Sequence, residues 1–186
     1  IEEFYHNPDD FPSGIDLNVH AENASISELQ ATPATPILNS WSIDDSVDNI
    51  LGEYSIGSGN LVAGAEAVQL NAPAGAPISF ADMVLLEQVV TSFPASVPMA
   101  VADTAQSLLV GFDSANASER LALYDTYSLS LIDDGTPSSH LSIEQLREFM
   151  GLKQFDLAGS DFDIVDSHTN ILDFLKSDAA DKSDIL

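Results

Sequence analysis

The first 119 residues of this chain contain no lysine and no arginine, and the five basic side chains all follow, from Arg120 to Lys182. Those 119 residues carry 17 acidic side chains, and the remaining residues carry 13 acidic against five basic ones, which gives the net charge of −25. Sites for phosphate groups, nucleic-acid backbones and anionic membrane surfaces depend on guanidinium or ammonium groups. The sequence therefore predicts that neither nucleic acid nor an anionic membrane surface is a partner.

The composition also indicates how many domains the chain can form and where the protein is located. A chain of 186 residues with 45% apolar side chains suits one folded domain, with its core supplied by the apolar runs at 80–93 and 121–132. Zero cysteine excludes disulfide bonds and thiolate nucleophiles. The chain begins with Ile and has no run of 18 apolar residues, so we expect a matured, trimmed or cut-out soluble fragment. The lack of trypsin-type cleavage sites over 119 residues would help a protein survive outside a cell, and we expect an extracellular or cell-surface location; drift under selection for few positive charges explains the lack equally well.

The opening segment, residues 1–36, predicts an extended, loop-rich arm, because X-Pro and Ser-Gly pairs interrupt it repeatedly. Residues 14–20 alternate apolar with polar side chains, which predicts a short strand at the edge of a sheet or added to a neighbouring protein. The apolar residues of this alternation, Ile15, Leu17 and Val19, are the expected contacts with another protein subunit.

After residue 36, the sequence predicts a linker region followed by helices. Residues 37–78 predict a mixed region of loops, a short helix and a small-residue linker, and residues 79–186 predict a helical domain with an acidic C-terminal segment. Serines that can cap helices, with Pro or Gly at the ends, place the expected helices near 80–90, 98–110, 118–132, 143–150 and 168–175. We therefore expect a mainly α protein: a small bundle of four to five short helices, with one or two short strands confined to the arm.

Three aspartates near the C-terminal end form the candidate metal site. If residues 161–164 are extended, Asp161 and Asp163 share one face of a strand, about 7 Å apart, with Asp166 nearby. Carboxylate oxygens are the ligands that Ca²⁺ prefers, so the three predict a calcium site. The alternative interpretation is a solvated acidic face on an ordinary strand.

Other motifs point to no specific chemistry. The run Gly57-Ser58-Gly59 resembles the start of a dinucleotide fingerprint, but Val62 stands where the third glycine is needed. The four histidines show no metal-binding spacing, and no serine lies in a G-x-S-x-G elbow.

The function expected from the sequence is a non-enzymatic, strongly acidic structural or interaction protein. It assembles with other protein subunits, as a homo- or hetero-oligomer, through its N-terminal arm. One alternative is a module that binds calcium or a small ligand through Asp161, Asp163 and Asp166. A second alternative, an acid-adapted or halophilic enzyme, rests on the acidic composition alone.

Overall fold

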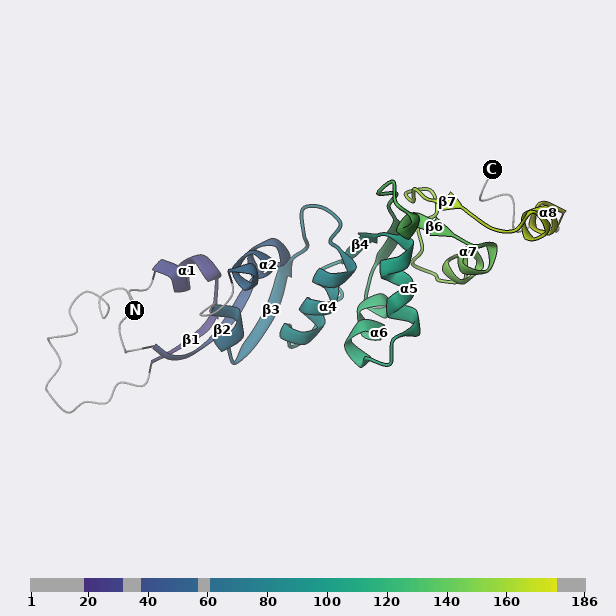
Figure 1. Ribbon diagram of the computed structural model, residues 1–186. Helices are drawn as coiled ribbons and strands as arrows, with labels where there is room; N and C mark the ends of the chain where they lie inside the picture. Colours follow the sequence, from purple (N-terminus) through teal and green to yellow (C-terminus); the bar gives the residue numbers. More distant parts are fainter. Residues whose placement is uncertain (1–18, 32–37, 57–60, 177–186) are drawn as a thin grey trace, which may run out of the picture. The chain divides into compact units, whose positions relative to one another are not determined.

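The computed structural model describes residues 19–31, 38–56 and 61–176 (Figure 1). The chain forms two compact units. Unit 1 contains the described residues up to Pro73 together with Val89–Val97, and unit 2 contains Ala74–Gln88 and the residues from Pro98 onward.

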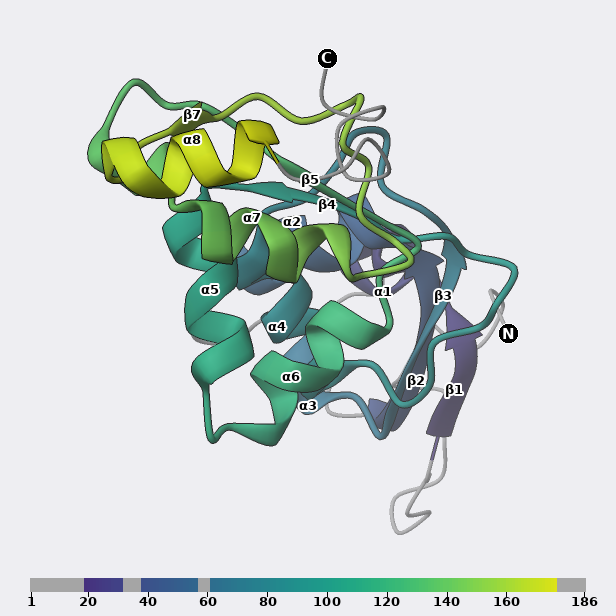
Figure 2. The same cartoon turned by 90° about the vertical axis from the view of Figure 1, so that its right-hand side faces the viewer.

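Unit 1 is a parallel sheet with helices between its strands. Its elements in chain order are β1 (Val19–Ala24), α1 (Ile26–Ala31), β2 (Leu38–Ser46), α2 (Val47–Ser55), α3 (Leu61–Gly64) and β3 (Ala67–Ala72). The strand order is β1-β2-β3, with β1 outermost, and the three strands lie side by side in Figure 2. All strand pairs are parallel, and Ser92 adds a further parallel bridge to Gln69 of β3.

Unit 2 repeats the pattern of short parallel strands and helices. Its elements are α4 (Phe80–Val89, whose last residue is counted in unit 1), β4 (Ala100–Asp103), α5 (Ala105–Asp113), α6 (Ala117–Tyr124), β5 (Ser128–Leu131), the 3₁₀-helix η3 (Pro137–Ser139), β6 (His140–Leu141), α7 (Ile143–Met150), β7 (Asp163–Ile164) and α8 (His168–Lys176). Strand β4 pairs with β5, and β6 pairs with β7. Isolated bridges join Ile78 to β4 and Phe155 to β5, again in parallel. The core includes Phe149, which is fully buried and makes an edge contact with Phe112 and a tilted contact with Phe155, each with ring centroids 5.4 Å apart.

The prediction of a mainly α helical bundle is wrong. The described residues form a mixed α/β fold with seven strands in three parallel sheets. Two predicted helices are in fact junctions between a helix and a strand: 98–110 divides into β4 and α5, and 118–132 divides into α6 and β5. In a strand of four residues, the spacing of apolar residues also fits one turn of a helix. The strands β4 and β5 were therefore predicted as parts of the neighbouring helices.

The predicted helix starts that rest on capping are confirmed. Ser142 and Gln145 form a capping box at the start of α7. The Ser79 hydroxyl accepts a hydrogen bond from the Asp82 amide at 3.1 Å, at the start of α4. The last expected helix, 168–175, corresponds to α8.

The two compact units divide the chain after Pro73, Gln88 and Val97, and the domain boundaries expected at residues 36 and 78 stay a prediction. Strand β1 and helix α1, which lie within the segment predicted as an arm, belong to unit 1 together with β2 and β3. Residues 1–18, which make up the first half of that segment, lie outside the described residues.

One local arrangement of two parallel strands and a helix occurs three times. In each copy a residue that is paired in parallel, in a strand or in an isolated bridge, is followed by a serine and a helix. Its pairing partner lies two positions before an aspartate. The three pairs are Ala24 with Ile43, Ile78 with Val101, and Leu141 with Ile164; the serines are Ser25, Ser79 and Ser142, and the aspartates are Asp45, Asp103 and Asp166. The chain is therefore built from an internal repeat, with one copy in unit 1 and two in unit 2.

Candidate functional site

The three repeated aspartates make the same hydrogen bonds in each copy. Each Oδ2 accepts from the first amide of the preceding Ser-capped helix, and each Oδ1 accepts from the amide of the next residue. The Oδ2 bonds come from Ile26 to Asp45 at 2.8 Å, from Phe80 to Asp103 at 2.9 Å and from Ile143 to Asp166 at 2.9 Å. The Oδ1 bonds come from Ser46 at 2.7 Å, Thr104 at 2.7 Å and Ser167 at 2.6 Å. Each carboxylate thus connects two helix starts.

An asparagine strengthens this arrangement in the first and third copies. The side-chain amides of Asn49 and Asn170 each donate to Oδ1 of their aspartate at 2.7 Å. Burial raises the pKa of Asp45, but the hydrogen bonds from Asn49, Ile26 and Ser46 outweigh it and hold that pKa below its usual value. The amides of Ile143 and Ser167, with Asn170, likewise lower the pKa of Asp166. These carboxylates are therefore held in their charged form.

The serines that open the repeats complete the helix starts. Ser25 and Glu28 form a reciprocal pair, in which the Ser25 amide donates to Glu28 Oε2 at 2.9 Å and the Ser25 hydroxyl accepts from the Glu28 amide at 3.3 Å. Ser142 and Gln145 make the same pair. The donors at these helix starts are thus satisfied by side chains of the chain itself, which gives the repeated polar residues an architectural role.

The predicted calcium ligands serve separate roles. The exposed Asp161 and Asp163 alternate with the half-buried Phe162 and Ile164, as the sequence predicted for a strand. The Asp161 amide donates to the Leu131 carbonyl at 2.8 Å, Asp163 Oδ2 lies 3.9 Å from His140 Nε2, and the Asp166 carboxylate is engaged with the helix starts. Among the described residues, these three included, no group of three or more His, Asp or Glu side chains is arranged to hold a metal ion.

Of the predicted interaction residues, only Val19 lies within the described part of the chain. It begins β1, where its Cα pairs with Leu38 of β2, so the residue belongs to the outermost strand of that sheet. Ile15 and Leu17 fall outside the described residues. The contact of these residues with another subunit stays a prediction.

A pair of carboxyl groups in unit 2 is unlike the repeated aspartates. Glu87 of α4 is half-buried, and its Oε1 has no hydrogen-bond partner in the described structure. Burial, the negative charge of Asp125 and a hydrogen bond with the Asp125 side chain raise the pKa of Glu87 to about 7. Glu87 therefore binds a proton in the folded protein at a pH where an exposed glutamate is ionised.

Replacing Glu87 with Gln should make stability less dependent on pH. Because the folded-state pKa is raised above the ordinary value of 4.5, the protonated form adds stability below that value, and this contribution is lost as the pH rises towards 7. Denaturant unfolding from about pH 5 to pH 8 should show wild-type stability falling relative to Glu87→Gln. The exposed Glu148→Gln is the control for the loss of one charge, and equal pH profiles for wild type and Glu87→Gln would contradict the assignment.

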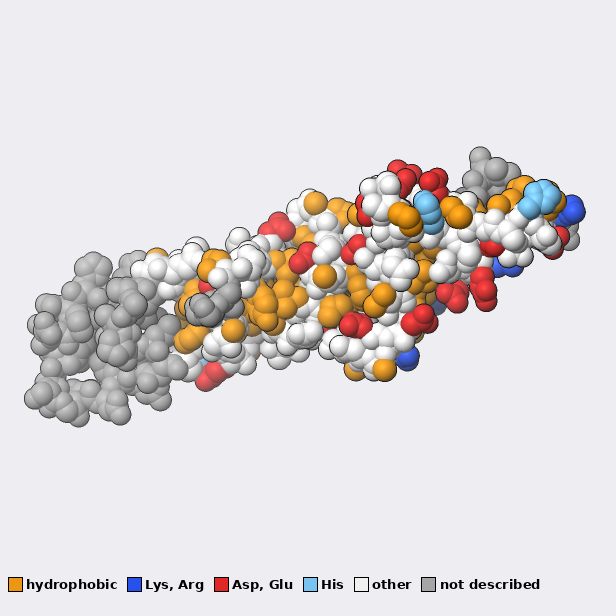
Figure 3. Space-filling view, in the orientation of Figure 1, with side chains coloured by type: hydrophobic (Ala, Val, Ile, Leu, Met, Phe, Trp, Pro, Cys, Tyr) orange, Lys and Arg blue, Asp and Glu red, His pale blue; other side chains and the backbone are white. Residues whose placement is uncertain are grey.

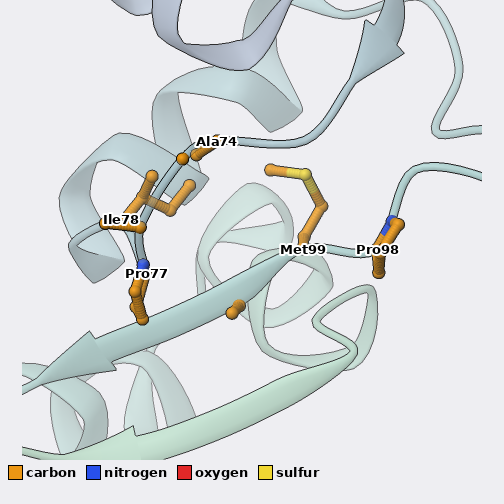
Figure 4. A pocket seen from close by; sticks show the side chains of 8 residues that line it. Ala74, Pro77, Ile78, Pro98 and Met99 are labelled. Atoms are coloured by element: carbon orange, nitrogen blue, oxygen red, sulfur yellow. The ribbon is translucent and has the colours of Figure 1, made fainter.

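A small apolar cavity of about 200 Å³ lies in unit 2 (Figure 4). Its lining consists of Ala74, Gly75, Ala76, Pro77, Ile78, Pro98, Met99 and Ala100. None of these side chains can act as an acid, a base or a nucleophile. The cavity therefore offers apolar volume and backbone groups but no catalytic group.

Comparison with known proteins gives no relative: no family model matches the chain, and neither a curated protein nor a solved structure is significantly similar. In the part of the chain that the structure describes, no helix has the length and apolar character needed to cross a membrane.

The repeated aspartates were missed as a set by the sequence reasoning, although the signal is present. Each Asp comes two residues after an Ile or Val and directly before Ser or Thr, and it lies five residues before an Ile or Leu of the next helix. The three instances are Asp45-Ser46 with Ile50, Asp103-Thr104 with Leu108, and Asp166-Ser167 with Ile171. A search for internal repeats finds this pattern.

Proposed function

We propose that this chain is a non-enzymatic, strongly acidic structural or interaction protein that joins other protein subunits outside the cell or at its surface. The observation that carries the proposal is the threefold use of an aspartate to connect two helix starts. The three repeated aspartates therefore stabilise the fold, because their carboxylates accept hydrogen bonds from the helix starts. Repeats of strand and helix in parallel array provide extended surfaces and open sheet edges, which suit contacts with proteins.

The proposed contact with other subunits is the N-terminal arm, through Ile15, Leu17 and Val19. Among the described residues, strand β1, in which Val19 lies, forms one edge of its sheet, and an edge strand presents backbone donors and acceptors to an added strand. The charge of −25 excludes most contacts with polyanions, whereas apolar strand residues contact other proteins irrespective of charge.

Deletion of residues 1–18 should abolish assembly, because it removes Ile15 and Leu17 while keeping β1. The matched control is deletion of residues 1–13, which keeps both apolar residues and should preserve assembly. The measurement is molar mass by light scattering during size-exclusion chromatography in saline buffer. A full chain that elutes as a monomer would contradict the proposal, and so would an assembly that persists after deletion of residues 1–18.

A further inference from the structure

Glu87 occupies a position on α4 where an apolar residue is expected. It lies on the same face of the helix as Phe80 and Met83, which are both buried. Its Oε1 is buried without a hydrogen-bond partner, and no other side-chain nitrogen or oxygen of the described residues is buried in this state. A buried acceptor without a partner costs free energy, and such departures from good packing concentrate at functional positions.

The partner of Glu87 is Asp125, at the C-terminal end of α6. Asp125 is the C-cap residue of that helix, and its side chain forms a hydrogen bond with Glu87. Helices α4 and α6 also meet beside Gly111 of α5, where an added Cβ would contact both Phe80 of α4 and Leu123 of α6. The Glu87–Asp125 carboxyl pair therefore joins two helices that already pack close together.

No positive charge compensates the carboxyl pair. Among the described residues, neither Glu87 nor Asp125 forms an ion pair with Lys, Arg or His. Arg120 of α6 donates its Nε to the Ser114 carbonyl, and Asp82, the other acidic residue of α4, accepts a hydrogen bond from the Ser79 hydroxyl. On the face of the molecule shown in Figure 3, acidic side chains far outnumber basic ones. Two adjacent carboxyl groups without a cation favour sharing one proton.

We propose that the Glu87–Asp125 carboxyl pair is a pH-sensitive contact, which holds the end of α6 against α4 when it carries a proton and releases it when both groups are ionised. With the proton, the pair makes a hydrogen bond between the two helices. Without it, two negative charges lie side by side, and one of them is half-buried. This contact acts within one chain and does not depend on assembly with other subunits.

Release of the α6 end should make α6 accessible to proteases. Trypsin cleaves after Lys or Arg, and Arg120, within α6, is the first such residue of the chain. Cleavage within a helix needs a locally unfolded backbone, so the rate of cleavage after Arg120 reports the opening of α6. If the pKa of Glu87 is 4.5 in the open state and about 7 in the closed state, the opening constant rises about tenfold from about pH 6 to pH 8.

The test is trypsin cleavage of the full chain at these two pH values, with the product that ends at Arg120 measured by mass spectrometry. Each rate is divided by the rate for a synthetic peptide of residues 117–124 at the same pH, which removes the pH dependence of the protease itself. The normalised rate of wild type should rise about tenfold. Glu87→Gln should show no rise, because glutamine does not ionise. Asp125→Asn should show a smaller rise, because its amide can donate to an ionised Glu87.

The control Glu148→Gln removes an exposed charge from α7 and should behave like wild type. The proposal is overturned if wild type and Glu87→Gln have the same pH dependence, or if Glu148→Gln also abolishes the rise. A full tenfold rise in Asp125→Asn overturns it as well, since Glu87 would then respond to burial alone. Absence of cleavage after Arg120 at about pH 8 would show that α6 does not open.

Urea separates opening of α6 from unfolding of the whole unit. Local opening exposes little surface, so about 1 M urea should change the cleavage rate at pH 8 by less than about twofold. Global unfolding exposes the core, and the same urea concentration would accelerate cleavage by about fivefold or more. The larger acceleration would overturn the proposed local contact.

Discussion

The variant Asp45→Ala is expected to lower the free energy of unfolding of unit 1 by about 3 kcal/mol. Asp45 is 6% exposed and accepts hydrogen bonds from the Ile26 and Ser46 amides and from Asn49. Alanine leaves two backbone donors at helix starts without their acceptor, and each such donor costs about 1–3 kcal/mol when buried. Urea unfolding followed by circular dichroism measures the change.

The control for this experiment is Asp44→Ala, which removes a neighbouring half-buried carboxylate while the Asp44 carbonyl still accepts from the Asn71 amide at 3.1 Å. Because hydrogen bonds lower the pKa of Asp45, its contribution is present above the unfolded pKa and is lost as the pH falls through the folded pKa. The difference between wild type and Asp45→Ala should therefore shrink below about pH 4. Equal effects of Asp45→Ala and Asp44→Ala would show that the carboxylate does not connect the helix starts.

The second large effect is expected at Phe149 of α7. Phe149 is fully buried and packs against Phe112 and Phe155, whose ring centroids both lie 5.4 Å away. Phe149→Ala removes the buried ring and leaves a cavity, which should lower the free energy of unfolding of unit 2 by about 3–5 kcal/mol. Thermal unfolding should show the loss as a lower Tm.

Tyr124→Ala provides the comparison, because this aromatic side chain on α6 is 70% exposed. Its removal should change the free energy of unfolding by about 0.5 kcal/mol or less. A Phe149→Ala variant as stable as Tyr124→Ala would mean that Phe149 is not part of a packed core.

Local signals in the sequence located several helix starts but not the fold. The Ser142–Gln145 capping box lies within four residues, so its hydrogen bonds could be predicted without knowledge of the tertiary structure. The strands could not, because β4 and β5 have four residues each and directly adjoin helices. What makes them strands is the parallel pairing between residues 28 positions apart, such as Val101 with Leu129, and no local pattern encodes that pairing.

In the candidate site, too, local spacing predicted some features, whereas others depend on contacts between distant residues. The alternation of Asp161 and Asp163 with apolar residues was predictable from local spacing. The role of Asp166 was not, because its Oδ2 partner, the Ile143 amide, lies 23 residues earlier in the chain. Only comparison of the three copies within the chain identifies the aspartate as part of a repeat.

Because basic residues are scarce, the repeated aspartates find their hydrogen-bond donors in the backbone. Up to Glu119 no lysine or arginine exists to pair with an acid. Asp45 and Asp103 instead accept hydrogen bonds from amides at helix N-termini, where the helix dipole favours negative charge. Backbone donors thereby stabilise acidic side chains in a chain that has few cations.

The most direct test of the proposed assembly is a native mass spectrum of the full chain, compared with its denatured mass. We expect assembled species at multiples of 19.8 kDa, in a fraction that increases with ionic strength, and a denatured chain at the sequence mass. A single species at 19.8 kDa at every concentration and ionic strength would contradict it.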